Sequence, residues 1–120
     1  MQRRDDVTIA YIGGGSRNWA WTLMTDLALQ ESLSRCIRLY DINKEAAKIN
    51  ETIGNHLSQR DDATGKWEYR AVDSLKEALC GADFVIVSIL PGTFEEMRSD
   101  VHMPEEYGIY QSVGDTVGPG

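Results

Sequence analysis

The sequence predicts an α/β fold, a doubly wound parallel sheet of the Rossmann type, because three observations agree. Strand-like and helix-like segments alternate along the chain, and parallel strands need a covering helix at each crossover. Three glycines separate the first strand-like segment from a helical pattern. A continuous apolar run at residues 83–90 is typical of a strand covered on both faces. About four strands are expected, so residues 1–120 form a partial, apparently truncated domain.

The first half of the chain predicts two strands and two helices. Residues 7–12 are apolar and β-branched, which indicates a strand, and residues 36–42 indicate a second one. Asn43 is the expected N-cap of the second helix. Helical spacing predicts an inward face for each helix, namely Ala20, Leu23, Met24, Leu27 and Ala28 in the first, and Ala46, Ile49, Ile53 and Leu57 in the second.

A third strand and a short helix follow. Residues 61–66 are polar and indicate a turn, and residues 67–72 alternate as a strand does. Ser74 and Glu77 have the spacing of a capping box, and Gly81 is the expected end of the helix that they begin.

The fourth strand is expected at residues 83–90, in the centre of a complete sheet ordered 3-2-1-4-5-6. This chain supplies only strands 3, 2, 1 and 4, so the fourth strand is expected to be an edge here. Thr93 and Glu96 again have capping-box spacing, which predicts a helix that continues until Pro104 interferes. Residues 110–120 are expected to form a loop. The last helix is expected to turn three side chains inward, those of Phe94, Met97 and Val101.

Composition excludes several classes of protein. The net charge is −7 and the 12 Lys and Arg residues are scattered, which disfavours a nucleic-acid partner. The first apolar run has about six residues, too short for a signal peptide or a membrane span, so we expect a cytoplasmic protein with no membrane partner. Cys36 and Cys80 have neither disulfide-framework nor metal-site spacing, and we expect both to be reduced.

The glycines and an acid at the end of the second strand indicate a dinucleotide site. Gly13, Gly15 and Asn18 occupy the positions of G-x-G-x-x-G, with Asn in place of the third glycine. Such a turn brings backbone N–H groups and a helix N-terminus close to a pyrophosphate. Asp41 stands where an acid binds the ribose hydroxyls of NAD, and it favours NAD over NADP. The alternatives are a plain turn that needs positive φ, and an acid that caps a turn.

These considerations give an expected set of cofactor contacts. The pyrophosphate is expected at the glycine turn, the adenosine ribose at the end of the second strand, and the adenine side at the end of the fourth. The residues are Gly13, Gly14, Gly15, Ser16, Arg17 and Asn18 for the pyrophosphate, Asp41 and Asn43 for the ribose, and Ser88, Ile89, Leu90 and Pro91 for the adenine side.

Four stretches together resemble the N-terminal region of family 4 glycoside hydrolases. They are IGGGS at 12–16, YDIN at 40–43, GADFVIVSI at 81–89 and MPEEYGIYQSVGDTVGPG at 103–120. The tail is the most specific of them, since P-x-x-YG followed by GPG is unusual among Rossmann domains. The resemblance covers nearly all of the chain.

The resemblance implies an NAD- and manganese-dependent hydrolase that oxidises C3 of the sugar. A tyrosine then removes the C2 proton, the glycosidic bond breaks by elimination, water adds and the hydride returns. In this family a Cys and a His downstream of this region hold the metal, and the tyrosine lies farther still. We therefore assign no metal ligand to Cys36, Cys80, His56 or His102, and we expect the isolated chain to be inactive.

The resemblance also narrows the substrate, a small-molecule glycoside. Members that act on 6-phosphosugars carry an Arg where this sequence has Met97, and Arg98 is one step away on the helix. Arg98 remains the candidate substrate residue, against the alternative of a solvated charge. The loop at residues 110–116 resembles that of α-galacturonidases, which favours an α-glycosiduronate such as an α-galacturonide. Asp115 matches an acid that assists the catalytic tyrosine, and its alternative is a turn residue.

Three other functions stay open at this point. The chain is also compatible with an NAD-dependent dehydrogenase domain, with a 6-phospho-glycosidase of the same family, and with an inactive NAD-binding module. A downstream His with an acid partner would indicate the dehydrogenase, and a downstream Cys and His with manganese dependence the hydrolase. We expect the protein to form a homo-oligomer.

Overall fold

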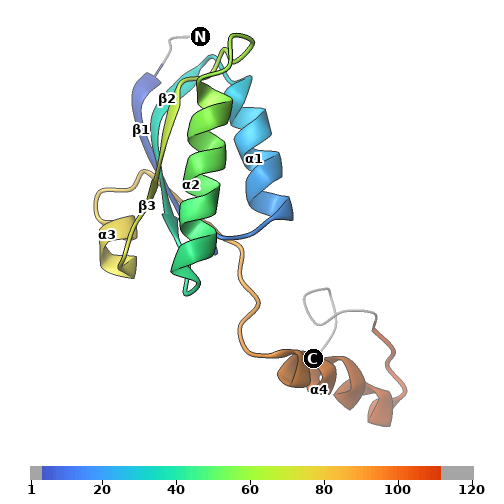
Figure 1. The fold of residues 1–120 in the computed structure, drawn as a ribbon. Helices are drawn as coiled ribbons and strands as arrows, with labels where there is room; N and C mark the ends of the chain where they lie inside the picture. Colours follow the sequence, from blue (N-terminus) through green and yellow to red (C-terminus); the bar gives the residue numbers. More distant parts are fainter. Residues whose placement is uncertain (1–3, 112–120) are drawn as a thin grey trace. The chain divides into compact units, whose positions relative to one another are not determined.

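The structure is a computed structural model that describes residues 4–111 (Figure 1). The chain divides into two units, Met1–Ile89 and Leu90–Gly120, and each is described by itself. No helix in the described range is both long and apolar enough to cross a membrane. The expected loop at the end of the chain falls largely on residues 112–120, outside the described residues.

The first unit contains one sheet of four parallel strands in the order β3-β2-β1-β4. This order confirms the predicted α/β fold. The strands are β1 (Arg4–Ile12), β2 (Leu33–Tyr40), β3 (Trp67–Ala71) and β4 (Phe84–Val87), and the helices are α1 (Asn18–Ala28), α2 (Lys44–Ser58) and α3 (Leu75–Leu79).

Helices cover both faces of the sheet. Tyr11 of β1 packs in the larger core cluster with Met24 of α1 and Ala47 of α2. Ala10 points to the opposite face, since side chains alternate along a strand, and packs with Ala78 of α3. The larger core therefore lies between the sheet and the α1–α2 pair, which Figure 1 shows side by side.

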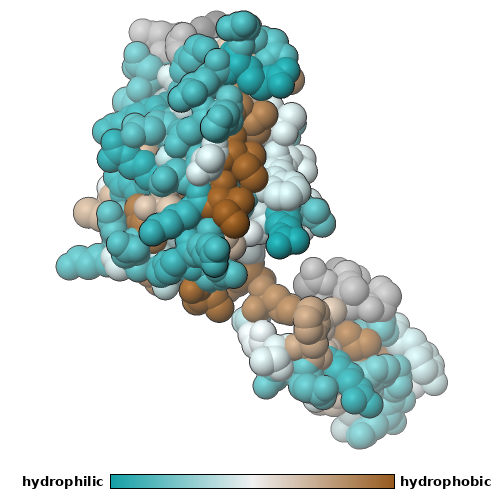
Figure 2. Space-filling view, viewed as in Figure 1, coloured by the Kyte–Doolittle hydropathy of each residue, from teal (hydrophilic) through white to brown (hydrophobic). Residues whose placement is uncertain are grey.

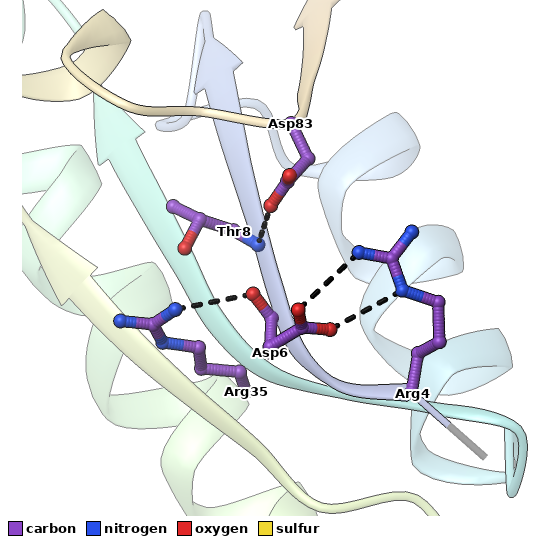
Figure 3. Close-up of polar contacts among 5 residues, drawn as sticks. All are labelled: Arg4, Asp6, Thr8, Arg35 and Asp83. Atoms are coloured by element: carbon purple, nitrogen blue, oxygen red, sulfur yellow. Dashed lines mark hydrogen bonds and ion pairs between the residues drawn. The ribbon is translucent and has the colours of Figure 1, made fainter.

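Polar contacts fasten the neighbouring strands to β1 near its amino end (Figure 3). The carboxylate of Asp83 accepts from the Thr8 N–H at 2.8 Å, and the Asp83 N–H donates to the Thr8 carbonyl at 2.8 Å. From β2, the Arg35 guanidinium donates to the Asp6 carbonyl at 3.1 Å. An exposed pair with Arg4 lowers the pKa of the Asp6 carboxyl, chiefly through a side-chain hydrogen bond. These contacts leave the carboxyl ends of the strands open for the site described below.

The predicted inward face of α2 is correct for Ile53 and Leu57, which are partly buried against the core, and wrong by about one residue nearer the start of the helix. Ile49 is 53% exposed and Ala46 is only partly buried, whereas Ala47, Asn50 and Gly54 are buried. Figure 2 agrees, because a hydrophobic band runs along this helix on an otherwise mostly hydrophilic face. The apolar pattern misled because a polar residue, Asn50, takes a buried position for its hydrogen bonds.

The fourth strand is shorter than predicted and lies at an edge. It spans Phe84–Val87 rather than 83–90, and within the described residues it pairs with β1 alone. Phe84 is 55% and Val87 64% exposed, so the expected cover on both faces is absent among the described residues. The edge position predicted for this chain from the strand order 3-2-1-4 is confirmed. The apolar composition was identified correctly, but its cover is missing among the described residues.

The second unit contains α4 (Phe94–His102) and a 3-10 helix, η1 (Met103–Tyr107). The predicted capping box is confirmed, because the Thr93 hydroxyl accepts from the Glu95 N–H and the Glu96 carboxylate accepts from the Thr93 N–H. Phe94 is 80% exposed, so its predicted inward orientation is wrong. Met97 and Val101 are half-buried, and no residue of α4 is fully buried.

Candidate functional site

The glycine turn lies where β1, β2 and β4 end. The N–H groups of Gly13 and Gly14 both donate to the Tyr40 carbonyl at 2.9 Å, which holds the turn against the end of β2. The Ser88 N–H donates to the Ile12 carbonyl at 2.9 Å on the β4 side. Figure 1 shows that α1 and α2 both begin at this end of the sheet.

Close packing explains why this turn is built of glycine. Gly13 has φ +92°, and a Cβ there would lie 1.9 Å from the Ser88 carbonyl oxygen. A Cβ on Gly14 would lie 2.8 Å from the Leu39 Cα, and one on Gly15 would lie 2.7 Å from the Ala46 Cβ. The turn therefore requires glycine for its own conformation, as the plain-turn alternative also expects. A ligand role must rest on the groups that the turn leaves free.

The start of α1 leaves backbone donors free. Arg17 is the N-cap residue, its side chain accepts no capping hydrogen bond, and the first turn has no acidic residue. Among the described residues, no acceptor contacts the N–H groups of Arg17 and Asn18. Both residues are exposed, and Ser16 beside them is half-buried. Free N–H groups at the positive end of a helix dipole form an anion-binding arrangement.

Asp41 joins the glycine turn to the start of α2. Its Oδ2 accepts from the Gly15 N–H at 2.8 Å, and its Oδ1 accepts from the Asn43 N–H at 2.9 Å. Each carboxylate oxygen has a further lone pair for another donor. Asn43 caps α2 as predicted, because its Oδ1 accepts from the Ala46 N–H at 3.1 Å. The structure thus brings Asp41 and Asn43 together with the glycine turn, and their contact with a ribose stays a prediction.

Asn50, which the sequence patterns did not predict as a site residue, bonds the glycine turn from α2. Asn50 is 2% exposed and lies on α2. Its Nδ2 donates to the Gly14 and Ser16 carbonyls at 2.8 Å each, and its Oδ1 accepts from the Trp21 Nε1 at 2.8 Å. The signal was the i, i+3, i+7 spacing of residues 47, 50 and 54, in which an asparagine stands in a buried stripe.

The residues predicted for the adenine side fall in two units. Ser88 lies beside Gly13, and Ile89 is 56% exposed. Leu90 and Pro91 begin the second unit and are exposed, so the structure does not place them at the turn. Their role stays a prediction.

The roles predicted for Arg98 and Asp115 from the family pattern both stay predictions. Arg98 is exposed and its Nη1 lies 3.9 Å from a Glu95 carboxylate oxygen, as a solvated helix charge would. Its role at the substrate stays a prediction. Asp115 lies outside the described residues.

Metal-binding residue types do not gather in the part of the chain that the structure describes. No three His, Cys, Asp or Glu side chains there are arranged to hold an ion. Cys36 is buried, and this burial raises the pKa of its thiol, whereas Cys80 is exposed. His56 contacts the Thr52 carbonyl and His102 pairs with Glu105. The described residues therefore give a candidate nucleotide-binding turn and no candidate metal centre.

Comparison with known proteins places this geometry in one family. The profile of the family 4 glycosyl hydrolases matches residues 8–120. An α-galacturonidase of Thermoanaerobacterium saccharolyticum is 70% identical over 115 residues, which are 96% of this chain and 25% of that protein. This chain therefore spans about a quarter of the length of the curated relatives that it matches.

Solved structures agree. The crystal structure of lplD from Bacillus subtilis has a TM-score of 0.77 and 55% identity, over 97% of this chain and 25% of that one. A 6-phospho-β-glucosidase of Thermotoga maritima, crystallised with manganese, NAD+ and glucose-6-phosphate, has a TM-score of 0.65 and 26% identity. That match covers 87% of this chain and 25% of the other.

Proposed function

This chain belongs to the family 4 glycosyl hydrolases, and we propose that it forms the NAD-binding part of an enzyme that cleaves α-galacturonides. The proposed substrate class is supported by the 70% identity to an α-galacturonidase. The cofactors, NAD and manganese, rest on the Thermotoga maritima relative that was crystallised with both. The activity belongs to the whole protein, of which this chain corresponds to about a quarter of a relative's length.

The observation that carries the proposal is the set of donors and acceptors at the glycine turn. The free N–H groups of Arg17 and Asn18 suit a pyrophosphate, which carries only acceptors. The carboxylate of Asp41, fixed by Gly15, suits the paired hydroxyls of a ribose. A 2′-phosphate would meet this negative charge instead, which favours NAD over NADP. When bound, NAD would supply the hydride acceptor for oxidation of the sugar.

Manganese would polarise oxygens of the sugar when bound, which is the Lewis-acid role. The described residues contain no suitable cluster of ligands. We propose that its Cys and His ligands, and the tyrosine that removes the C2 proton, lie in parts of the protein beyond this chain. Isolated residues 1–120 would then bind the nucleotide without catalysing hydrolysis.

The substrate proposal separates uronides from 6-phosphosugars. Met97 stands where the phosphosugar enzymes of the family carry Arg, and it is half-buried on α4. Arg98 is exposed and only weakly paired with Glu95, so its guanidinium is available to a carboxylate such as that of a galacturonide. We retain Arg98 as the residue of this chain that contacts the substrate.

An assay of the intact protein on two substrates tests the proposed function. We expect cleavage of an α-galacturonide that needs both NAD and Mn²⁺, and little cleavage of a 6-phospho-α-glucoside. Dialysis against a chelator should abolish hydrolysis, and Mn²⁺ should restore it. Cleavage of the phosphosugar in preference to the uronide would contradict the substrate, and hydrolysis without NAD would contradict the cofactor.

The proposed role of Asp115 has its own test. A carboxylate near a tyrosine hydroxyl assists the loss of its proton, so Asp115→Asn should slow deuterium exchange from solvent at C2 of a bound substrate. Affinity for NAD should stay nearly unchanged. Equal exchange rates in the two forms would leave Asp115 as a turn residue.

A further inference from the structure

We propose that Asn50 and Trp21 form a positioning pair that orients the glycine turn for NAD. This inference rests on the proposed function, because it assigns the pair to the same nucleotide site. Neither side chain belongs to the glycine motif. They approach the turn from α2 and α1, the two helices that begin beside it.

The hydrogen bonds of Asn50 satisfy its whole amide in a buried place. Both carbonyls that it holds, those of Gly14 and Ser16, are 2.8 Å from its Nδ2, and its Oδ1 accepts from the Trp21 indole at 2.8 Å. The indole contact has a specific effect, since it fixes which end of the amide faces the turn. A buried asparagine without these partners would be costly, so its contacts explain its place in the core.

The direction of the held carbonyls determines the direction of the free donors. In a trans peptide the carbonyl and the following N–H point in opposite directions. The Ser16 carbonyl points at Asn50 on α2, so the Arg17 N–H of the same peptide points away from α2. The Gly14 carbonyl is held in the same way, and the N–H of that peptide, on Gly15, donates to Asp41. Asn50 therefore presents one donor to the anion and aligns the other with the ribose-binding acid.

The chain offers a matched control on the same helix. Asn55 also bridges a backbone donor and acceptor, since its Nδ2 donates to the Tyr69 carbonyl and its Oδ1 accepts from the Tyr69 N–H, both at 2.9 Å. It contacts β3 rather than the glycine turn. Replacement of either asparagine by aspartate removes the amide donors and nearly keeps the shape. Asn50 loses the donors to two carbonyls, and Asn55 loses the donor to one, so the control variant makes the same chemical change at a half-buried position away from the turn.

The test measures NAD affinity of the intact protein by calorimetry, at a temperature where each variant is folded. We expect Asn50→Asp to weaken NAD binding by about 10- to 100-fold, because an aspartate would repel the two carbonyls. Asn55→Asp should change it by less than about twofold. Trp21→Phe keeps the Nδ2 donors of Asn50 and removes the indole N–H with part of the ring, so a weakening of NAD binding by about threefold to tenfold is expected.

Hydrogen exchange at the turn supplies a readout that does not need NAD. Gly15 and Ser16 N–H groups are bonded within the site, so their exchange should speed up at least about tenfold in Asn50→Asp and stay unchanged in Asn55→Asp. Equal NAD affinity and equal exchange in the two aspartate variants would overturn the positioning role. If the unaltered protein fails to bind NAD, the proposed function is wrong, and the exchange rates alone then decide whether Asn50 orders the turn.

Discussion

The two edges of the sheet differ in how their backbone groups are satisfied. At the β3 edge, side chains of α2 take the place of a further strand. Asn55 bonds both the N–H and the carbonyl of Tyr69 at 2.9 Å, and the Glu51 carboxylate accepts from the Ala71 N–H. Since alternate residues of an outer parallel strand point their backbone groups outward, these contacts close that edge.

The β4 edge has no such closure among the described residues. Its strand pairs only with β1 there, and its apolar side chains are exposed, with Phe84 at 55%, Val85 at 50% and Val87 at 64%. A groove of about 400 Å³ beside it is lined by residues of α1, β1 and the β4 strand. An apolar strand with an open edge is a site for further pairing. The comparison shows that side chains of α2 close the sheet at β3, whereas β4 is the edge left open to further pairing among the described residues.

The largest effect is expected on the association of the isolated 120-residue chain. We predict that it forms dimers or larger aggregates through β4, and that Val85→Lys with Val87→Lys weakens this association by at least about tenfold, because charges on an edge oppose pairing. The control adds the same charge elsewhere, with Ile49→Lys and Thr52→Lys at two exposed positions of α2. Sedimentation velocity over a range of concentrations measures it. A monodisperse monomer with a cooperative thermal transition would break the comparison.

A smaller effect is expected when the closed edge is opened. Asn55→Ala leaves the Tyr69 N–H and carbonyl without their partners, so the free energy of unfolding should fall by about 1–3 kcal/mol. Thr52→Ala, on the exposed face of the same helix, should change it by less than about 0.5 kcal/mol. Urea unfolding gives both values. Equal losses for the two variants would show that the contact does not close the edge.

Alkaline pH should weaken the packing behind the closed edge. Burial raises the pKa of Tyr69, so the unfolded state ionises first as pH rises. The contribution of the neutral Tyr69 hydroxyl to the free energy of unfolding is fully present below about pH 10, the ordinary pKa of tyrosine. Above that pH it falls by at most about 1.4 kcal/mol per pH unit. Unfolding measured between neutral pH and pH 11 should show this slope, and Tyr69→Phe should flatten it. The same slope in both forms would assign it to other groups.

The smallest effect is expected from the charges on β3. Arg70 and Glu68 form a pair at 2.8 Å, but both side chains are more than half exposed. Glu68→Gln should therefore change stability by less than about 0.5 kcal/mol, and added salt should reduce even this difference. A larger change in urea unfolding would mean that surface charge, rather than the contacts from α2, protects this edge.

Local patterns in the sequence predicted most of the fold. The alternation of strands and helices gave the sheet, and Ser74 and Thr93 gave the starts of two helices, because a capping residue acts on its nearest neighbours. The strand order of a doubly wound sheet predicted that β4 lies at an edge in this chain, and the structure confirms it. The apolar run at β4 indicates that other elements cover this strand, but the sequence pattern does not identify them.

In the candidate site too, residues in local patterns were predicted and a residue held by distant contacts was not. Gly13 and Asp41 were predicted because a glycine turn and a terminal acid have fixed places in this fold, and the structure joins them through Gly15. Asn50 was not, since helical periodicity treats a polar residue as exposed. Its burial depends on the Gly14 and Ser16 carbonyls, which are more than 30 residues away in the chain.

The most direct test of the NAD-binding assignment is calorimetry of the intact protein and its Asp41→Ala variant with NAD and with NADP. Asp61→Ala, in the exposed turn before β3, is the control. We expect Asp41→Ala to weaken NAD binding at least about tenfold and to reduce the preference for NAD over NADP, while Asp61→Ala binds both as the unaltered protein does. Unchanged NAD affinity in Asp41→Ala, with no gain for NADP, would contradict it.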